Sequence, residues 1–409
     1  MPSYSGVWTL TAQYQAKANL QWPQAPGAPT SVSATAGDAQ ATVTFVAPTF
    51  AGIPAGITGY LATSSPGGLT ASGASSPLTV TGLSNGTSYT FGVQATNSIG
   101  YGPAGTSGSV SPSAPIAVFS GGYAAPPTGE TVNAMDYVTI ATTGNATDFG
   151  DLVSVSNDNA ACASSTRGVI KAGNAGSSAL NYITFASAGD ASSFGNLSVV
   201  IGGLASANSS TRGLFGGGTS PRTSVINYIT IATTGNSSSF GFISGERTYL
   251  AACSSSTRAV WVGGSNASGT RQGSNYYSTI ATLGDTAYFG EISTATANLA
   301  GCSNATRGIF AGGEDNGGYL NTMRYITIAS TGNTTDFGNL AANNNFLAAG
   351  TNTTRAIFGG GQPASSYISA VNTMQYVTIA TTGNTTNFGQ LTMNRSQLAG
   401  CSSANGGTQ

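Results

Sequence analysis

The sequence predicts an all-β protein in which a β-sandwich is followed by a larger array of repeated four-stranded units. Glycine, serine, threonine and asparagine are abundant, and the apolar segments are short, β-branched and bounded by turn residues, a pattern typical of strands. Residues 27–114 hold one series of such segments, and beyond residue 115 a single phrase occurs six times. We therefore expect a leading segment at 1–26, a sandwich at 27–114 and the repeats at 115–409.

Composition excludes several chemistries before any motif is considered. The 409 residues include 12 Lys or Arg, 13 Asp or Glu and no histidine, so only 6% are charged. Nucleic-acid binding requires a basic stripe along the phosphates, and Lys17 and Lys171 are the only lysines. A chain without imidazole has no His base and no His-ligated metal. We expect no nucleic-acid partner, no metal and no cofactor.

The chain carries no segment typical of membrane insertion or export. No apolar run approaches the ~18–20 residues of a membrane-spanning helix, and residues 1–4 lack the basic and apolar regions of a secretory signal. We expect a protein made in a cytoplasm that does not insert into a membrane.

Residues 1–26 contain two of the three tryptophans, in a piece too short to bury them alone. One interpretation is a leader strand packed on the sandwich. The other is an anchor that docks the protein to a larger assembly through Trp8, Leu10, Tyr14 and Trp22. The opening, with Gly-Val-Trp-Thr-Leu and a Gln-rich stretch before Trp-Pro, resembles virion proteins of tailed phages, notably marine ones. That resemblance implies a virion location and a docking role.

Residues 27–114 are predicted to form a β-sandwich. A strand with period-2 alternation at 41–46 is followed by strand-like segments at 57–61 and 89–97. The stretch resembles a fibronectin type III domain, with Leu83 and Tyr89 at the tyrosine-corner motif, in which the phenol bonds back to the backbone before the sixth strand. Phe45 stands where that family usually has a core tryptophan. The resemblance implies that Phe45 is buried.

Repetition dominates the rest of the chain. The tyrosine of the phrase Tyr-Val-Thr-Ile-Ala-Thr-Thr-Gly-Asn stands at residues 137, 182, 228, 277, 325 and 376. Within a typical unit the order is a small-residue run, then a segment such as Arg-Gly-Ile-Phe closed by a glycine pair, then the tyrosine phrase, then a short segment ending in Phe-Gly. Each piece has strand length and each break carries turn residues, so a unit reads as a four-stranded antiparallel sheet.

This order resembles the kelch repeat, whose period is about 50 residues, although phenylalanine replaces the tryptophan usual in the fourth strand. The last copy ends after a first strand at 398–401, and the segment 116–122 opens the repeats without one. Pairing of these two ends would complete one unit and hide the sheet edges. We expect a six-bladed kelch-like β-propeller closed by pairing of its N- and C-terminal strands.

Several residue types recur at one repeat position. A ring of arginines could grip an anionic sugar, as in sialidase propellers, or each guanidinium could bond carbonyls of an adjacent turn. We favour the second interpretation, because no paired carboxylates accompany the arginines and we expect no catalytic residue. The arginines are Arg167, Arg212, Arg258, Arg307 and Arg355.

Cysteines and asparagines recur in the same way. Cys162, Cys253, Cys302 and Cys401 share one position that Ala207 and Gly350 hold elsewhere, which predicts free, buried thiols. A copper oxidase resembling galactose oxidase would need histidine ligands. The asparagine of each Thr-Gly-Asn phrase is expected to bond its own backbone in a turn.

The connection after each glycine pair varies from unit to unit, and in propellers this connection lies beside the mouth of the central channel. Function usually sits on such loops, and Tyr and Arg are favoured at recognition hot spots. Plain solvated loops are the alternative. The candidate ligand- or receptor-binding residues are Tyr123, Arg222, Arg271, Tyr276, Tyr319 and Tyr367.

Together these features predict a non-enzymatic virion appendage protein, of tail-fibre or adhesin type. It would dock to other virion proteins through residues 1–26, form oligomers in the particle and bind a host surface glycan or protein with its propeller. The alternative is a capsid or tail decoration protein that contacts only other virion subunits.

Overall fold

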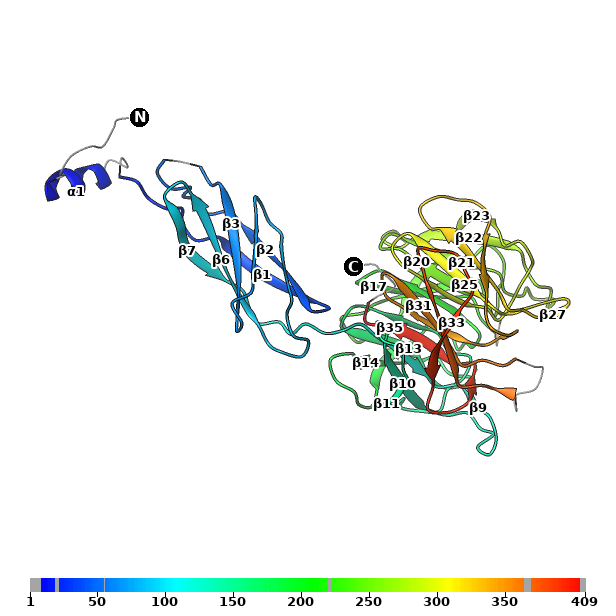
Figure 1. Cartoon of the computed structure of the whole chain (residues 1–409). Coiled ribbons are helices and arrows are strands. Elements are labelled where there is room, and N and C mark those ends of the chain that lie inside the picture. Colours follow the sequence, from blue (N-terminus) through cyan, green and yellow to red (C-terminus); the bar gives the residue numbers. More distant parts are fainter. Residues whose placement is uncertain are drawn as a thin grey trace. The chain divides into compact units, whose positions relative to one another are not determined.

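The computed structural model describes residues 9–18, 22–54, 56–174, 176–219, 222–363 and 369–404. Two compact units make up the chain, Met1–Ala114 and Pro115–Gln409 (Figure 1). Strands account for 48% of the structure and helix for 2%. The all-β prediction is therefore confirmed.

The leading segment differs from the expected strand. Its described part forms a helix, α1 (Leu10–Ala18), which begins where Thr9 Oγ1 accepts a hydrogen bond from the backbone N–H of Ala12 at 3.2 Å. Threonine is a favoured N-cap, and the Leu, Ala, Gln and Lys of this stretch are strong helix formers. The leader-strand interpretation is wrong for these residues, because their local helix propensity was overlooked.

The rest of the first unit is a sandwich of two antiparallel sheets. The three-stranded sheet has the order β1-β2-β5, and the four-stranded sheet has the order β4-β3-β6-β7. In chain order the strands are β1 (Thr30–Gly37), β2 (Gln40–Val46), β3 (Gly59–Ser65), β4 (Thr70–Gly73), β5 (Leu78–Thr81), β6 (Thr90–Asn97) and β7 (Gly100–Thr106).

The two features expected of this sandwich are present. Phe45 is buried in the core, and its ring centroid lies 4.7 Å from that of Tyr60. The Tyr89 hydroxyl accepts a hydrogen bond from the backbone N–H of Ser84 at 3.1 Å, directly before β6. The phenol thus fixes the crossing chain, as the tyrosine-corner resemblance implied.

In its described residues, the second unit contains six four-stranded antiparallel sheets, here called sheets 1 to 6. The strands of each sheet are given in order across the sheet, beginning with the strand nearest the central channel, which is called the inner strand. Sheet 1 is β35 (Ala399–Ser402), β8 (Ile116–Ser120), β10 (Ala134–Thr139) and β11 (Thr147–Asp151). Sheet 2 is β12 (Ala161–Ala163), β13 (Arg167–Lys171), β14 (Ala179–Thr184) and β15 (Ser192–Asn196). Sheet 3 is β16 (Ala205–Asn208), β17 (Arg212–Gly216), β18 (Val225–Thr230) and β19 (Ser238–Phe242).

The remaining sheets repeat this pattern. Sheet 4 is β20 (Ala251–Ser254), β21 (Arg258–Val262), β22 (Ser274–Thr279) and β23 (Ala287–Glu291). Sheet 5 is β24 (Ala300–Ser303), β25 (Arg307–Ala311), β28 (Thr322–Thr327) and β29 (Thr335–Asn339), and sheet 6 is β30 (Ala348–Thr351), β31 (Arg355–Gly359), β32 (Thr373–Thr378) and β33 (Thr386–Gln390). Two small ribbons pair β9 (Tyr123–Ala124) with β34 (Arg395–Ser396) and β26 (Glu314–Asp315) with β27 (Gly318–Tyr319).

The inner strands surround a narrow central channel. Each inner strand contacts the inner strand of the next sheet, and β35 contacts both β12 and β30. Cavities along the channel are lined by small residues from all six inner strands, among them Ala161, Ser206, Ala252, Gly301, Ala349 and Gly400. Small side chains at this position let six strands approach one axis.

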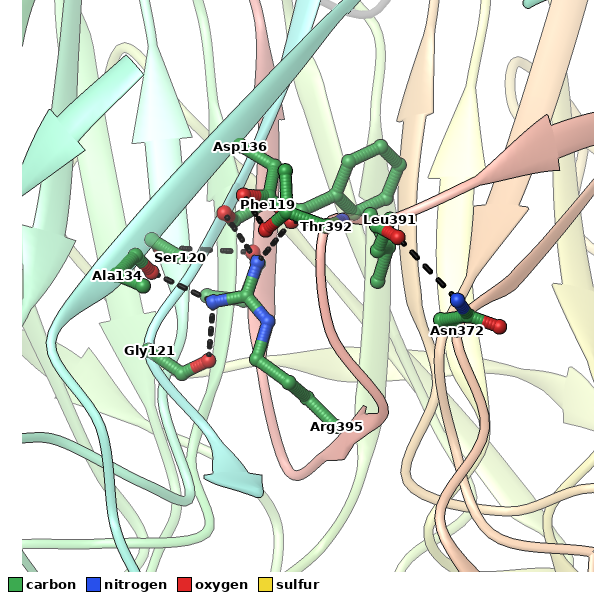
Figure 2. A network of polar contacts seen from close by, with 10 residues as sticks. Phe119, Ser120, Gly121, Ala134, Asp136, Asn372, Leu391, Thr392 and Arg395 are labelled. Carbon is green, nitrogen blue, oxygen red and sulfur yellow. Dashed lines mark hydrogen bonds and ion pairs between the residues drawn. The ribbon is translucent and has the colours of Figure 1, made fainter. Parts of the chain in front are cut away.

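Sheet 1 joins the two ends of the second unit. β35, from the C-terminal end, pairs antiparallel with β8. A buried ion pair lies beside this pairing (Figure 2): Arg395 Nη2 donates to Asp136 Oδ2 at 2.6 Å, and Nη1 donates to the carbonyls of Gly121 and Ala134. The Thr392 hydroxyl donates to the other carboxylate oxygen at 2.6 Å. Residues more than 250 positions apart are thus joined in one polar network.

The repeated arginines have the structural role that was favoured. Each donates from Nη1, at 2.7–3.1 Å, to two carbonyls at the end of the third strand of the next sheet. Each guanidinium also lies 4.2–4.7 Å from the centroid of the repeat tyrosine of its own sheet. Arg355 of sheet 6 bonds Ile140 and Ala141 of sheet 1. Ile116 occupies the equivalent position in sheet 1.

The repeat asparagines act between sheets, which corrects the expected local turn bond. Asn236 Oδ1, for example, accepts the backbone N–H of Asn196 in the fourth strand of the preceding sheet. The same bond, at 2.9–3.1 Å, is made by Asn145, Asp190, Asp285, Asn333 and Asn384. A turn that pairs with a neighbouring edge strand satisfies groups that would otherwise face water.

The four cysteines are free and buried, as predicted. A Cβ on Gly213, Gly308 or Gly168 of the next sheet would overlap the sulfur of Cys162, Cys253 or Cys401. Where the cysteine is replaced by Gly350, the facing residue is the larger Ala117. Cys302, whose core cluster contains Ala356, departs from this size matching.

Candidate functional site

Two sets of connections lie at the same end of the six sheets, here called the loop face. Because all strands are antiparallel, the second-to-third-strand loops end on the same side as the segments that lead into the inner strands. Isolated bridges join the two sets directly, for example Thr248 with Ser265 and Ala297 with Glu314. The loop face thus surrounds one end of the channel.

Six equivalent residues form this end of the channel and are called the channel mouth: Asp158, Gly203, Tyr249, Asn298, Phe346 and Gln397. All six have a positive φ of 50–60°, a region that non-glycine residues adopt rarely. From Gly203 to Gln397, each donates its backbone N–H to the carbonyl of the preceding member at 2.7–3.2 Å. This ring of backbone hydrogen bonds holds the strained conformation in place. It sets Gly203 and five variable side chains around one cavity.

The channel mouth encloses a cavity of about 80 Å³. Tyr249 and Phe346 form an edge-to-face pair there, with ring centroids 5.9 Å apart. Among the described residues, Asp158 Oδ1, Asn298 Oδ1 and Asn159 Nδ2 are buried and have no hydrogen-bond partner. Buried polar atoms are normally satisfied, so these three atoms are available to a polar group in the cavity.

Two charged groups set the electrostatics of the site. Burial raises the pKa of Asp158 to about 6, and the positive charge of Lys171 partly opposes that rise. Burial likewise lowers the pKa of Lys171 to about 8. The Lys171 ammonium donates to the carbonyls of Gly173 and Asn174 at 2.8 and 3.2 Å. At neutral pH the channel mouth therefore holds one largely ionised carboxylate, and the ammonium of Lys171, which is outside the cavity lining, is engaged with backbone.

The predicted binding residues on the loops contact neighbouring loops. Arg222 donates to the carbonyl of Asn266. Arg271 forms an ion pair with Glu314 at 2.7 Å and also bonds Asn316. Tyr319 Oη accepts from Gln362 Nε2 at 3.4 Å. These bonds join the loops of sheets 3 to 6 into a continuous rim, but none of the five candidates that the structure describes lines the channel-mouth cavity.

Two other candidates lie apart from that rim, and the third falls outside the described residues. Tyr123 is in β9 and its hydroxyl donates to the carbonyl of Gly129 at 2.6 Å. Tyr276 is on the strand β22, where its ring lies 6.1 Å from that of Tyr288 and under the guanidinium of Arg247 at 5.2 Å. Its assignment to a loop is therefore corrected. Tyr367 lies outside the described residues.

The four candidate anchor residues have different surroundings. Leu10 and Tyr14 lie one helical turn apart on α1 and are 84% and 78% exposed. Trp22 is half-buried, and its backbone N–H donates to the carbonyl of Ala16. Trp8 lies outside the described residues. The first two side chains are thus accessible for docking.

The channel-mouth residues were not among those predicted from the sequence, although they share one position in the repeat. The residue four positions before the repeated Cys, Ala or Gly is Asp158, Gly203, Tyr249, Asn298, Phe346 or Gln397. Leu-Ala follows it in five of the six units. A fully variable residue inside an otherwise constant phrase indicates a position that is free of packing constraints.

In the part of the chain that the structure describes, no three His, Cys, Asp or Glu side chains gather as a metal site would require. No helix there is long and apolar enough to cross a membrane.

Comparison with known proteins supports both units. The fibronectin type III domain model matches residues 27–111. The solved structure titled "Structure of YjhT" resembles the chain with a TM-score of 0.50 and 10% sequence identity, over 60% of this chain and 87% of that one. YjhT is a kelch-type β-propeller protein, and at this identity the likeness shows fold alone. No curated protein matches the sequence.

Proposed function

We propose that residues 115–409 form a six-bladed kelch-like β-propeller and that the protein is a non-enzymatic recognition component of a tailed-phage particle. Its loop face, with the channel mouth at the centre, would bind a glycan or protein on the host surface. The six sheets, the pairing of β35 with β8 and the contacts among the inner strands support this architecture.

The observation that carries the recognition role is the contrast between scaffold and mouth. The residues that join the sheets are nearly constant around the ring, whereas the six residues at the channel mouth are six different types. Binding residues commonly lie on variable segments positioned by a rigid scaffold. An aromatic pair and unpartnered polar atoms in one concavity are the usual features of a small binding site.

The virion assignment rests on the leading segment. Leu10 and Tyr14 project from one face of α1 and are exposed, which suits docking to another virion protein. We propose that residues 1–26 provide the attachment, that the fibronectin type III domain acts as a spacer and that several copies assemble in the particle.

A second candidate function is a decoration protein that contacts only other virion subunits. The bonds between neighbouring loops favour this alternative, because Arg271 and Tyr319 are engaged within the chain. Such side chains stabilise the rim and present less free surface to a host ligand.

Two measurements on the full chain separate these functions. Saturable binding to an array of bacterial surface polysaccharides, or to host cells, supports the recognition role. No binding at high protein concentration contradicts that role and supports the decoration role. Imaging of tagged protein on the particle tests the virion location. Deletion of residues 1–26 should abolish incorporation, and normal incorporation of the deleted protein would refute the docking role.

A further inference from the structure

We propose that the channel mouth takes a single primary ammonium group carried on a flexible stem, such as a lysine side chain or the amine of an amino sugar. This inference rests on the proposed recognition role of the loop face and names the chemistry that the site would recognise.

The size of the cavity suits a small group. A volume of about 80 Å³ holds a few water-sized groups. A primary ammonium is a group of this size, so we take the ligand to enter end-on, with the rest of its molecule extending from the mouth.

The hydrogen-bonding character of the mouth favours donors. Asp158 and Asn298 are three positions apart among the six, so they lie on opposite sides, and each has a buried oxygen without a partner among the described residues. An ammonium has three donors and no acceptor, which suits a site whose unpartnered side-chain oxygens accept hydrogen bonds. Asn159 Nδ2, an unpartnered donor in the same lining, can serve an acceptor oxygen on the stem.

The charge and the aromatic residues of the channel mouth also favour an ammonium ligand. Asp158 is the only acidic residue of the channel mouth, and the lining contains no basic residue. The rings of Tyr249 and Phe346 flank Asn298, and aromatic rings attract a nearby cation through their quadrupole. An anionic group would meet a carboxylate, so it is disfavoured. Lys171, the nearby cation, is held by two carbonyls.

The test is ligand-observed NMR on the full chain with methylammonium, N-α-acetyl-lysine methyl ester and glucosamine. Each of the last two is paired with its N-acetylated counterpart, which keeps the stem and removes the charge. We expect dissociation constants on the order of 1 mM for the amines, as for a single small anchoring group, and at least tenfold weaker binding of the acetylated forms. Comparison of the lysine and amino-sugar pairs identifies which stem is preferred.

Variants locate the binding at the mouth. Asp158→Asn keeps the shape and a residue that tolerates positive φ, and should weaken amine binding at least tenfold. Asn298→Asp adds a second carboxylate and should tighten it. The matched control is Asp190→Asn in a third-to-fourth-strand turn, where four other units already have asparagine, and it should leave binding unchanged.

The results separate this inference from the proposed function. Equal binding of amine and acetylated probes, or amine binding unaffected by Asp158→Asn, overturns the ammonium site. If the full chain still binds surface polysaccharide in that case, the recognition role stands without this chemistry. Amine binding at the mouth by a chain that binds no host material supports the site and contradicts the recognition role.

Discussion

Arg395 donates to the carboxylate of Asp136 at 2.6 Å, and both side chains are fully buried. The pair joins the segment before the last strand to the third strand of sheet 1. Breaking a buried pair leaves an uncompensated charge. We therefore expect Arg395→Met or Asp136→Asn to lower the free energy of unfolding of the second unit by about 3–5 kcal/mol.

This loss can be followed through Trp261, which is buried in the second unit, in a chain with Trp8 and Trp22 replaced by Phe. Arg222→Met, at an exposed arginine, is the matched control and should change the free energy of unfolding by less than about 0.5 kcal/mol. Equal effects of Arg395→Met and Arg222→Met would show that the buried pair contributes no net stability.

The arginine that joins sheet 6 to sheet 1 gives a second prediction. Arg355 bonds the carbonyls of Ile140 and Ala141 and stacks over Tyr376. Arg355→Met should cost about 1.5–3 kcal/mol, because it removes hydrogen bonds from a charged donor. Ile116→Met, at the equivalent position of sheet 1, is the control and should cost less than about 1.5 kcal/mol. Urea unfolding of both variants measures the difference, and equal losses would contradict a clamping role.

Size matching between inner strands and their neighbours gives a third prediction. Gly308→Ala should destabilise the second unit by about 1–3 kcal/mol, because the new methyl group would overlap the sulfur of Cys253. Adding Cys253→Ala makes room for it, so the double variant should recover most of the loss. A double-mutant cycle measures this coupling, and strictly additive losses would show that the two positions do not compete for space.

Asp158 gives a pH prediction. Its pKa is raised to about 6 by burial, so the folded state holds this proton more tightly than the unfolded state does. Its stabilising contribution is complete below about pH 4 and is lost as the pH rises through about 6. Asp158→Asn should therefore stabilise the chain by about 3 kcal/mol at pH 7 and have little effect at pH 4.

Urea unfolding at pH 4 and pH 7 checks this difference, because Lys171, with a pKa of about 8, stays largely protonated over that range. A variant that is equally stabilised at both pH values would assign the effect to packing rather than to the charge.

Much of the fold could be predicted because the same pattern of strands occurs six times in the sequence. The spacing of Tyr137 and its equivalents defined the units, and the incomplete units at the two ends pointed to the pairing of β35 with β8. The buried Phe45 and the bond to Tyr89 followed from the positions of aromatic residues in one domain pattern. These features depend on local periodicity, which a single sequence records.

The predictions that failed concern residues whose contact partners are distant in sequence. Asn236 bonds a neighbouring sheet rather than its own turn, and both geometries suit the same residue in the same phrase. The channel mouth arises only when six residues about 50 positions apart meet around one axis. The helix α1 is different, because its composition already favoured helix. It was missed because the all-β pattern of the remaining chain outweighed a nine-residue stretch.

We propose that the channel mouth is the recognition site of this protein. Binding of the full chain to an array of bacterial surface polysaccharides tests this proposal. The double variant Tyr249→Ala and Phe346→Ala, which removes the aromatic pair, is compared with Asp190→Asn. We predict that the double variant stays folded and loses at least tenfold in affinity, while Asp190→Asn binds normally. Unchanged binding by the folded double variant would contradict the claim.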